Sequence, residues 1–326
     1  MTDPTRREPH AGRDIDVLVL GEINPDVVVR ATDPTPSFGQ VERFVDSIDL
    51  VIGSSSAIFA CGAARLGLRT AFVGVVGDDP MGRFMLDAMR ARGVDVAGCR
   101  VDRDVPTGAS VILTSSSDRA ILTAQGTMPL LRDEDIPEAL VARARHVHVG
   151  SVFQLDALRP RLAARLGAAR RAGLTTSADC NWDPRETWDG GLWEILRETD
   201  VFLPNVAEAT RITGTTDVEA AARALVAAGP RVVAVKCGTD GAIAVARDGI
   251  LTRVPSLAVD AVDTTGAGDS FDAGFLAGFL AGRPVRDCLA LGVAAGSLSI
   301  LGIGGTASQP TLPDAEDAAR AAGLLS

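Results

Sequence analysis

The chain contains no tyrosine, and aromatic residues make up only 4% of its 326 residues. A nucleobase in a ligand would therefore have to stack on one of a few Phe or Trp side chains, which disfavours a nucleoside without excluding it. The chain also lacks a basic excess, since its formal net charge is −10. A phosphate backbone needs a basic face, so we expect no nucleic-acid partner.

Two motifs of large enzyme classes are missing. No GxxxxGK[ST] segment occurs, which excludes a Walker-type phosphate loop. No GxGxxG opens the first helix, which counts against a nicotinamide-dependent dehydrogenase. No CxxC pair occurs either, and scattered cysteines are typical of small buried side chains in a reducing compartment, so we expect a cytoplasmic protein. The five cysteines are Cys61, Cys99, Cys180, Cys237 and Cys288.

The organisation of the chain follows from its patterns. Residues 1–14 lack the apolar segment of a signal peptide, and we expect a disordered leader there, followed by one α/β domain over 15–326. The uncharged run 289–305 is rich in Gly and Ser, which favours a buried helix and a loop over a membrane span. From residue 140, strand and helix patterns alternate. This predicts a doubly wound, mostly parallel sheet flanked by helices.

Two groups of short strands, within about 27–50 and 100–125, do not fit this alternation and predict a small β-sheet lid. The expected strands are Val27–Arg30, Pro34–Gly39, Val41–Leu50, Thr107–Thr114 and Ala120–Ala124, the last two joined by a turn at Ser115–Asp118.

The most informative stretch is Val262–Gly274, VDTTGAGDSFDAG, whose central GAGD and Ser270 precede the apolar run Phe271–Ala281. Apolar residues at helical spacing predict a loop that opens a helix. Small residues leave the first-turn N–H groups open to an anion, and the helix dipole favours a phosphate there; they are Gly266, Ala267 and Gly268. A phosphate would repel Asp269, so a general base is one explanation for it. The alternative is a helix cap beside a simple turn.

A second polar cluster follows the first strand. The run Ile15–Leu20, IDVLVL, is typical of a strand buried on both faces. Ligands of open α/β sheets bind just beyond the carboxyl ends of such strands. Asn24 and Asp26 lie there, two residues apart, and suit hydrogen bonds to vicinal hydroxyls of a sugar. An ordinary Asn-Pro-Asp turn is the alternative.

The segment TTGAGDSFDAGF resembles the C-terminal signature of the ribokinase-like (PfkB) carbohydrate kinases. The resemblance covers nearly the whole chain after the leader. It implies that Asp269 is the catalytic base and that Gly266, Ala267 and Gly268 form an anion hole. It also implies that Asn24 and Asp26 bind the sugar, and that the lid covers the sugar and forms a homodimer interface.

The substrate loop departs from the family. Members commonly show GGxxxN, whereas this chain reads GSSSAI from Gly53 to Ile58. We expect Gly53, Ser54 and Ser55 to contact the substrate, because serine hydroxyls can bond to a sugar and Ile58 cannot. The pocket should therefore differ from that of true ribokinase.

Further matches imply the cofactors. Pro204–Glu208 matches the family motif NxxE, which implies that Asn205 contacts nucleotide phosphate and that Glu208 orders Mg²⁺ through water. From the residues alone, the alternative is a helix cap at Asn205 and a first-turn charge at Glu208. The resemblance implies an ATP loop at KCGTDGA, with Gly238 and Gly241, although Lys236 stands where the family often has Thr. The segment from Asp179 to Arg185 resembles the family's DxNxR pattern, and Arg185 either approaches the phosphates or pairs with a carboxylate.

Family members that need potassium hold it between the loop after the last long helix and the Asp before the anion hole. The matching oxygen-bearing candidates are Asp263, Thr265, Ser299, Gly302, Gly304 and Ser308. The sequence thus predicts an ATP- and Mg²⁺-dependent kinase that phosphorylates a primary hydroxyl of a sugar or sugar-like molecule. A nucleoside kinase, a vitamin-precursor kinase and a non-catalytic sugar- or nucleotide-binding regulator remain alternatives.

Overall fold

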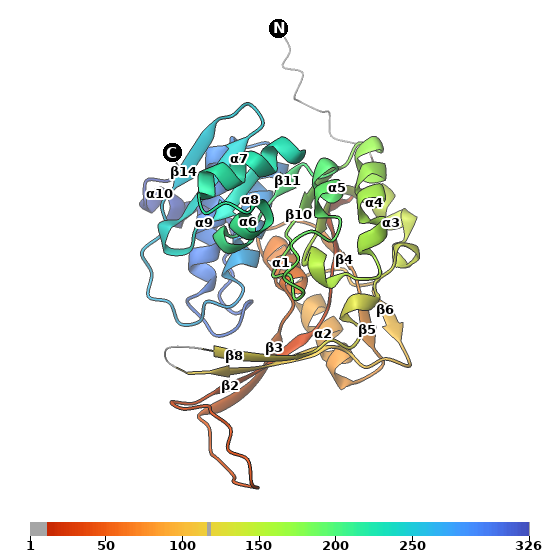
Figure 1. Ribbon diagram of the computed structural model, residues 1–326, viewed down its shortest axis with the longest axis vertical. Coiled ribbons are helices and arrows are strands. Elements are labelled where there is room, and N and C mark those ends of the chain that lie inside the picture. Colours follow the sequence, from red (N-terminus) through yellow and green to blue (C-terminus); the bar gives the residue numbers. More distant parts are fainter. Residues whose placement is uncertain (1–11, 116–118, 326) are drawn as a thin grey trace.

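The computed structural model describes residues 12–115 and 119–325 and is built on an eight-stranded sheet (Figure 1). The strand order is β14-β13-β12-β11-β10-β9-β1-β4. Strands β12, β13 and β14 pair antiparallel, and the remaining neighbours pair parallel. The strands are β1 (Ile15–Leu20), β4 (Thr70–Val73), β9 (Ala144–Val149), β10 (Thr175–Ala178), β11 (Val201–Phe202), β12 (Val232–Lys236), β13 (Ala242–Ala246) and β14 (Leu251–Val254).

Both faces of this sheet are buried, as the apolar run of β1 predicts. Val17 and Val19 join one hydrophobic core, while Leu18 and Leu20 join the other. The first core contains residues of α1 (Ser55–Arg65), α2 (Pro80–Ala91), α8 (Ala267–Leu280), α9 (Val285–Ser299) and α10 (Leu312–Ala321). The second contains residues of α3 (Glu138–Arg143), α4 (Arg159–Arg171), α5 (Leu192–Arg197), α6 (Val206–Thr213) and α7 (Val218–Ala228). This is the expected doubly wound arrangement.

The lid is a separate four-stranded sheet of order β3-β2-β7-β8, set apart from the helical layers in Figure 1. Its strands are β2 (Pro25–Arg30), β3 (Ser47–Ile52), β7 (Ala109–Thr114) and β8 (Arg119–Ala124). The prediction of a strand at Pro34–Gly39 is wrong, and only the last part of Val41–Leu50 is a strand. Two prolines that lack N–H donors, followed by a turn at Gly39, explain why this excursion does not pair.

Smaller elements complete the fold. Strands β5 (Val75–Gly77) and β6 (Arg100–Asp102) form a two-stranded sheet, and short 3₁₀ turns lie between the larger elements. The turns are η1 (Met128–Leu130), η2 (Asp133–Asp135), η3 (Val152–Gln154) and η4 (Gly238–Asp240). Of the predicted leader, residues 1–11 lie outside the described residues, as do residues 116–118 of the predicted turn. Arg13 donates hydrogen bonds to the carbonyls of Ala172 and Gly173, and Asp14 pairs with Arg143.

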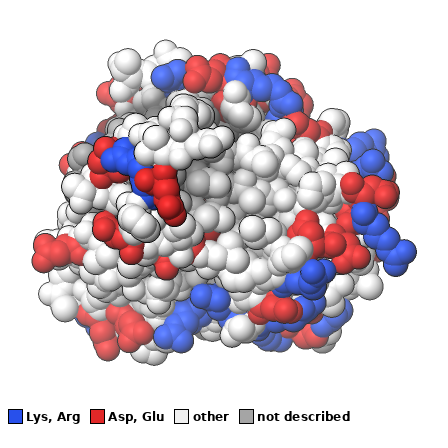
Figure 2. All heavy atoms as spheres, turned by 90° about the horizontal axis from the view of Figure 1, so that it is seen from below, with Lys and Arg blue, Asp and Glu red and all other residues white. Residues whose placement is uncertain are grey.

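Within the described ranges, each helix is too short or too polar to span a bilayer. On the face that Figure 2 shows, acidic and basic side chains are interspersed around a largely uncharged centre rather than gathered into a basic patch.

Candidate active site

Polar side chains gather beyond the carboxyl ends of the central strands. Glu22 follows β1, Ser151 follows β9, Asp179 follows β10, and Lys236 ends β12. Helix α8 begins beside these residues. A Cβ on Gly268, in its first turn, would lie 3.5 Å from the Lys236 side chain. In open α/β sheets this edge is where ligands bind.

Helix α8 opens with the predicted glycine turn. Its N-cap Gly266 has a φ of 74°, which suits glycine. A Cβ there would also lie 2.7 Å from Cα of Gly305 and 2.9 Å from Ile58, so the loops pack too closely for a side chain. Ile58 is buried and packs beneath this turn, in the position that the family usually gives to asparagine. The turn leaves the first N–H groups of α8 without intrahelical acceptors.

Asp269 lies in the first turn of α8 and is partly buried. Burial raises the pKa of Asp269 to about 8; the charges of Asp179 and Glu22 raise it further, while Lys236 and a hydrogen bond from Ser55 oppose the shift. A carboxyl group with a pKa near neutrality is matched to proton transfer at physiological pH.

Lys236 is the buried cation of the site. Its Nζ lies 2.8 Å from Oδ2 of Asp179 and 3.1 Å from both carboxylate oxygens of Asp272. Burial alone would lower the pKa of Lys236, but the carboxylates of Asp179, Asp272 and Glu208 raise it well above the usual value. The ammonium therefore stays charged, and its donors bond to carboxylates beside the N-terminus of α8.

The NxxE motif forms a reciprocal cap on α6. The Asn205 side chain accepts a hydrogen bond from the Glu208 N–H (2.9 Å), and Glu208 accepts one from the Asn205 N–H (2.8 Å). Burial, aided by the charge of Asp179, raises the pKa of Glu208 to about 7. The motif therefore forms the helix cap that is the alternative interpretation, and it also places the buried carboxylate of Glu208 in the site.

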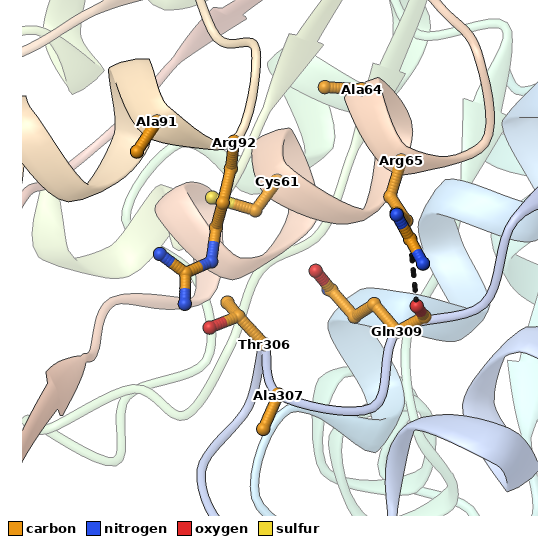
Figure 3. Close-up of a pocket in the computed structure, with 8 residues that line it drawn as sticks. All are labelled: Cys61, Ala64, Arg65, Ala91, Arg92, Thr306, Ala307 and Gln309. Carbon is orange, nitrogen blue, oxygen red and sulfur yellow. Dashed lines mark hydrogen bonds between the residues drawn. The ribbon is translucent and has the colours of Figure 1, made fainter.

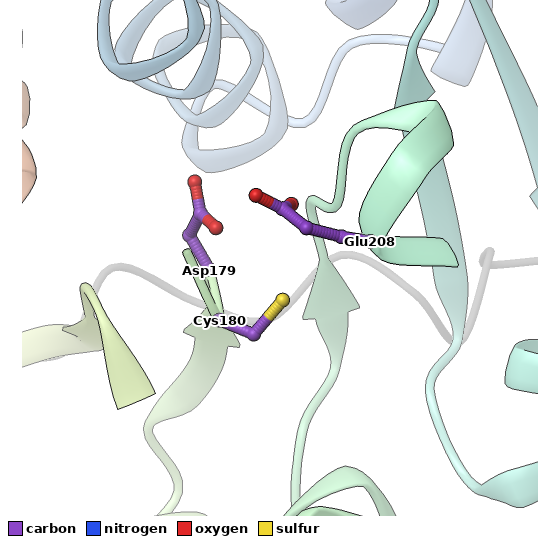
Figure 4. Close-up of side chains that lie close together, drawn as sticks. All are labelled: Asp179, Cys180 and Glu208. Atoms are coloured by element: carbon purple, nitrogen blue, oxygen red, sulfur yellow. The ribbon is translucent and has the colours of Figure 1, made fainter. Parts of the chain in front are cut away.

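Asp179, Cys180 and Glu208 bring one potential ligand atom each within 4.8 Å of one another (Figure 4). The two carboxylates supply oxygen ligands of the kind that Mg²⁺ prefers. Burial raises the pKa of Cys180 well above its usual value, so the thiol stays protonated and does not suit a hard cation. Asp179 and Glu208 therefore fit magnesium, and Cys180 does not.

The acceptor-side residues also lie together. The Asn24 side-chain amide donates a hydrogen bond to Oδ1 of Asp26 (3.3 Å), as expected for two side chains on one face. Burial raises the pKa of Asp26 to about 6, while a hydrogen bond from Ser110 and the charge of Arg119 oppose the shift. A Cβ on Gly53 would lie 2.3 Å from Oδ1 of Asp26, which requires glycine there.

The three serines of the substrate loop have different partners. The Ser54 hydroxyl donates to the Glu22 carbonyl (2.7 Å) and caps α1, and the Ser56 hydroxyl donates to Glu22 Oε2 (2.5 Å). Ser55 instead accepts a hydrogen bond from Asn181 (3.0 Å) and lowers the pKa of Asp269. Ser55 is therefore the serine of this loop that adjoins the candidate base.

The nucleotide-loop residues follow β12. Asn205 and Lys236 are linked by a β-bridge, and the Lys236 N–H donates to the Pro204 carbonyl. Gly238 has a φ of 58° and open space around its Cβ position, whereas a Cβ on Gly241 would lie 2.1 Å from the carbonyl oxygen of Val254. Gly241 is thus required by strand packing. Arg185 makes two hydrogen bonds to Asp156, which realises the carboxylate pairing.

The potassium candidates lie on two loops that meet. Asp263 bonds to Thr265 and to the Gly304 N–H, and a Cβ on Gly302 would lie 2.2 Å from the Ser308 hydroxyl. The Ser299 hydroxyl donates to the Gly296 carbonyl (2.9 Å). The potassium site itself stays a prediction.

Sequence reasoning missed two site residues, Glu22 and Asp272, which contact predicted site residues. The spacing of Asp269 and Asp272, one helical turn apart, is the signal in the sequence for Asp272. Asp179 and Asn181, which belong to the DxNxR segment, contact Lys236 and Ser55.

A pocket of about 590 Å³ lies elsewhere (Figure 3). Arg65 from α1 and Arg92 after α2 face the loop that carries Thr306, Ala307 and Gln309, and Arg65 donates to the Gln309 carbonyl (3.4 Å). None of the predicted site residues lines this pocket, so it is not the candidate active site.

The chain is similar to known proteins over most of its length. The family model described as pfkB family carbohydrate kinase matches residues 14–312. A 5-dehydro-2-deoxygluconokinase from Geobacillus kaustophilus is 28% identical, over 93% of this chain and 92% of that protein. An ATP-dependent ribose-1-phosphate kinase from Halopiger xanaduensis is 32% identical, over 90% of this chain and 95% of that protein.

Among solved structures, one described as a ribokinase II from E. coli, in complex with ATP and Mg²⁺, superposes with a TM-score of 0.82. The superposition covers 94% of this chain and 99% of the ribokinase II chain. Because the two sequences are only 23% identical, this similarity supports the fold alone. The family match spans both the lid and the signature that contains Asp269. The chain therefore belongs to the pfkB family of carbohydrate kinases.

Proposed function

We propose that the protein transfers the γ-phosphoryl group of ATP to a primary hydroxyl of a sugar or sugar derivative, with Asp269 as general base. The observation that carries this proposal is the position of Asp269 in the first turn of α8, with a pKa raised to about 8. A carboxylate placed there takes the proton from the acceptor hydroxyl as its oxygen attacks phosphorus.

The N–H groups of the Gly266–Gly268 segment stabilise the negative charge that develops on the transferred group. The first turn of a helix offers N–H donors that lack intrahelical acceptors, together with positive potential, and Lys236 adds a fixed positive charge beside it. Asn205 and Gly238 contact the nucleotide phosphates.

Glu208 would hold, through water, the magnesium that accompanies ATP, with Asp179 beside it. The ion would supply positive charge that neutralises the phosphate oxygens. The contacts of Asp263 argue against the predicted potassium site.

Asn24, Asp26 and Gly53 form the acceptor side, while Ser54 supports it by holding Glu22 and capping α1. Ser55 adjoins both Asp269 and Asn181. The names of the relatives suggest acceptors to test, namely a deoxygluconate derivative and a sugar phosphate.

The test is ADP release from ATP and Mg²⁺ in the presence of sugars, sugar acids, sugar phosphates and nucleosides. We expect one chemical group of acceptors to stimulate ADP release and to be phosphorylated in equal amount. A protein that binds ATP and sugar without turnover under all these conditions is the non-catalytic regulator instead. Stimulation by nucleosides alone identifies a nucleoside kinase.

We also propose that the lid forms a homodimer. Strand register places Leu50, Val27, Val111 and Leu122 in one row across the sheet, and Leu50 and Leu122 are 43% and 66% exposed. An apolar sheet face of this kind favours burial against a second copy. Sedimentation equilibrium of the protein and of Leu122→Glu tests this, since the substitution should shift a dimer toward the monomer. A cytoplasmic location is proposed with it, because all five cysteines are free.

A further inference from the structure

The carboxylate of Asp263 lies just before the proposed anion hole, and four donors surround it. Its Oδ1 accepts hydrogen bonds from the N–H (3.0 Å) and the hydroxyl (2.7 Å) of Thr265. Its Oδ2 accepts one from the Gly304 N–H (2.9 Å) and one from the guanidinium of Arg30 (3.3 Å). The Arg30 and Asp263 side chains are 21% and 15% exposed, so water screens this ion pair only weakly.

These contacts leave no lone pair of the carboxylate for a further cation. A carboxylate offers about four acceptor positions on its two oxygens. Each oxygen of Asp263 already accepts two hydrogen bonds. An alkali cation needs oxygens that present lone pairs to it, and N–H groups pointing at the same carboxylate repel it. The donor set around Asp263 therefore does not fit potassium coordination by this residue.

The charge of Asp263 is nevertheless balanced. Burial would raise the pKa of Asp263, but the N–H groups of Gly304 and Thr265, the Thr265 hydroxyl and the charge of Arg30 hold it below its usual value. The carboxylate is thus ionised at neutral pH.

The lid delivers Arg30 to this position by its register. Asp26, Val28 and Arg30 alternate onto one face of β2, so the acceptor-side Asp26 and Arg30 share a face. The pairing places Arg30 beside Thr114, and Thr114 beside Arg119. Arg119 donates to the Thr265 hydroxyl (3.4 Å). Two arginines of the lid therefore reach the loop that leads into the anion hole.

We propose that Arg30 supplies, from within the chain, the positive charge that a bound monovalent cation supplies in potassium-dependent kinases, so that this protein needs no potassium. The proposal rests on the proposed function, because it concerns the loop that shapes the anion hole. Arg30 acts as a positioning residue. It holds Asp263, and Asp263 in turn holds the loops of Thr265 and Gly304 in place beside the N-terminus of α8.

The test compares initial rates in potassium chloride and in tetramethylammonium chloride at equal ionic strength. We expect the unmodified protein to give the same rate in both salts within about twofold, because bulk screening is equal. In Arg30→Gln we expect a loss of roughly tenfold or more in tetramethylammonium, the size of a lost charge-assisted hydrogen bond. Potassium should restore part of this loss. Arg43→Gln is the matched control, because it removes an exposed ion pair with Asp33 in the segment between β2 and β3. Its initial rate should be the same in both salts.

A second readout does not depend on an acceptor being known. The melting temperature of Arg30→Gln should rise when potassium replaces tetramethylammonium, and that of the unmodified protein should not. A potassium-induced rise in the unmodified protein, or a rate that collapses without potassium, overturns the proposal. If no acceptor is phosphorylated under any condition, the proposed function fails while the melting experiment still decides the role of Arg30. If Arg30→Gln does not fold, the salt response of the unmodified protein decides alone.

Discussion

Replacing Asp269 by Asn removes the proposed base while keeping the size and shape of the side chain. Asn cannot take a proton from the acceptor hydroxyl, and general-base catalysis contributes about 10²- to 10⁴-fold. This corresponds to about 3–5 kcal/mol in the activation free energy, at 1.36 kcal/mol per tenfold. Because ATP and acceptor contacts lie on other residues, we expect the loss in kcat and little change in the binding of either substrate.

Folding provides an internal check on the same variant. The folded-state pKa of Asp269 is raised to about 8, so its contribution to stability is present at acidic pH and is lost as the pH rises toward 8. Above that pH the ionised carboxylate opposes folding, and Asn does not. We therefore expect Asp269→Asn to be at least as stable as the unmodified protein at alkaline pH in urea unfolding.

The assay is single-turnover phosphorylation with enzyme in excess over ATP, which isolates the chemical step from product release. Asp287→Asn is the matched control, because Asp287 also lies in the first turn of a helix, α9, and has no part in the proposed site. We expect Asp287→Asn to leave the rate of the chemical step unchanged. Near-normal single-turnover rates in a folded Asp269→Asn protein would refute the assignment of Asp269 as base.

Three further predictions follow from the same contacts. The value of kcat/KM for the acceptor should rise with pH to a plateau above about 8, because the raised pKa of Asp269 keeps the base protonated at lower pH; a flat profile from pH 6 to about 9 contradicts this. Lys236→Met should lower the free energy of unfolding by about 3 kcal/mol, because it strands buried carboxylates, and urea titration measures the loss. Gly53→Ala should raise the acceptor KM by about tenfold with a smaller change in that for ATP, because its Cβ displaces Asp26; equal changes in both would point to general misfolding.

Local sequence patterns were sufficient for the parts of the site that are local in the chain. The loop that opens α8, the cap formed by Asn205 and Glu208, and the paired side chains of Asn24 and Asp26 each involve residues within a few positions of one another. Spacing and residue type determine such features, and the structure has them where they were expected.

The missed features join distant positions. Lys236 bonds to Asp179, 57 residues away, and Arg30 bonds to Asp263, 233 residues away. The tertiary fold brings these pairs together, and no local pattern in the sequence predicts their contact. The strand predicted at Pro34–Gly39 is wrong for a related reason. Its residues have the local signals of a strand and a turn, but none of the described strands pairs with this segment.

The central claim is transfer of a phosphoryl group to a primary hydroxyl, and the most direct measurement is identification of the product. Once an acceptor is found, ³¹P NMR of the reaction mixture with proton coupling shows which carbon carries the new ester, while ADP is quantified in the same sample. We predict one phosphate ester on a CH₂–O group for each ADP formed. Inorganic phosphate in place of an ester, or an ester on a ring hydroxyl, would contradict the account.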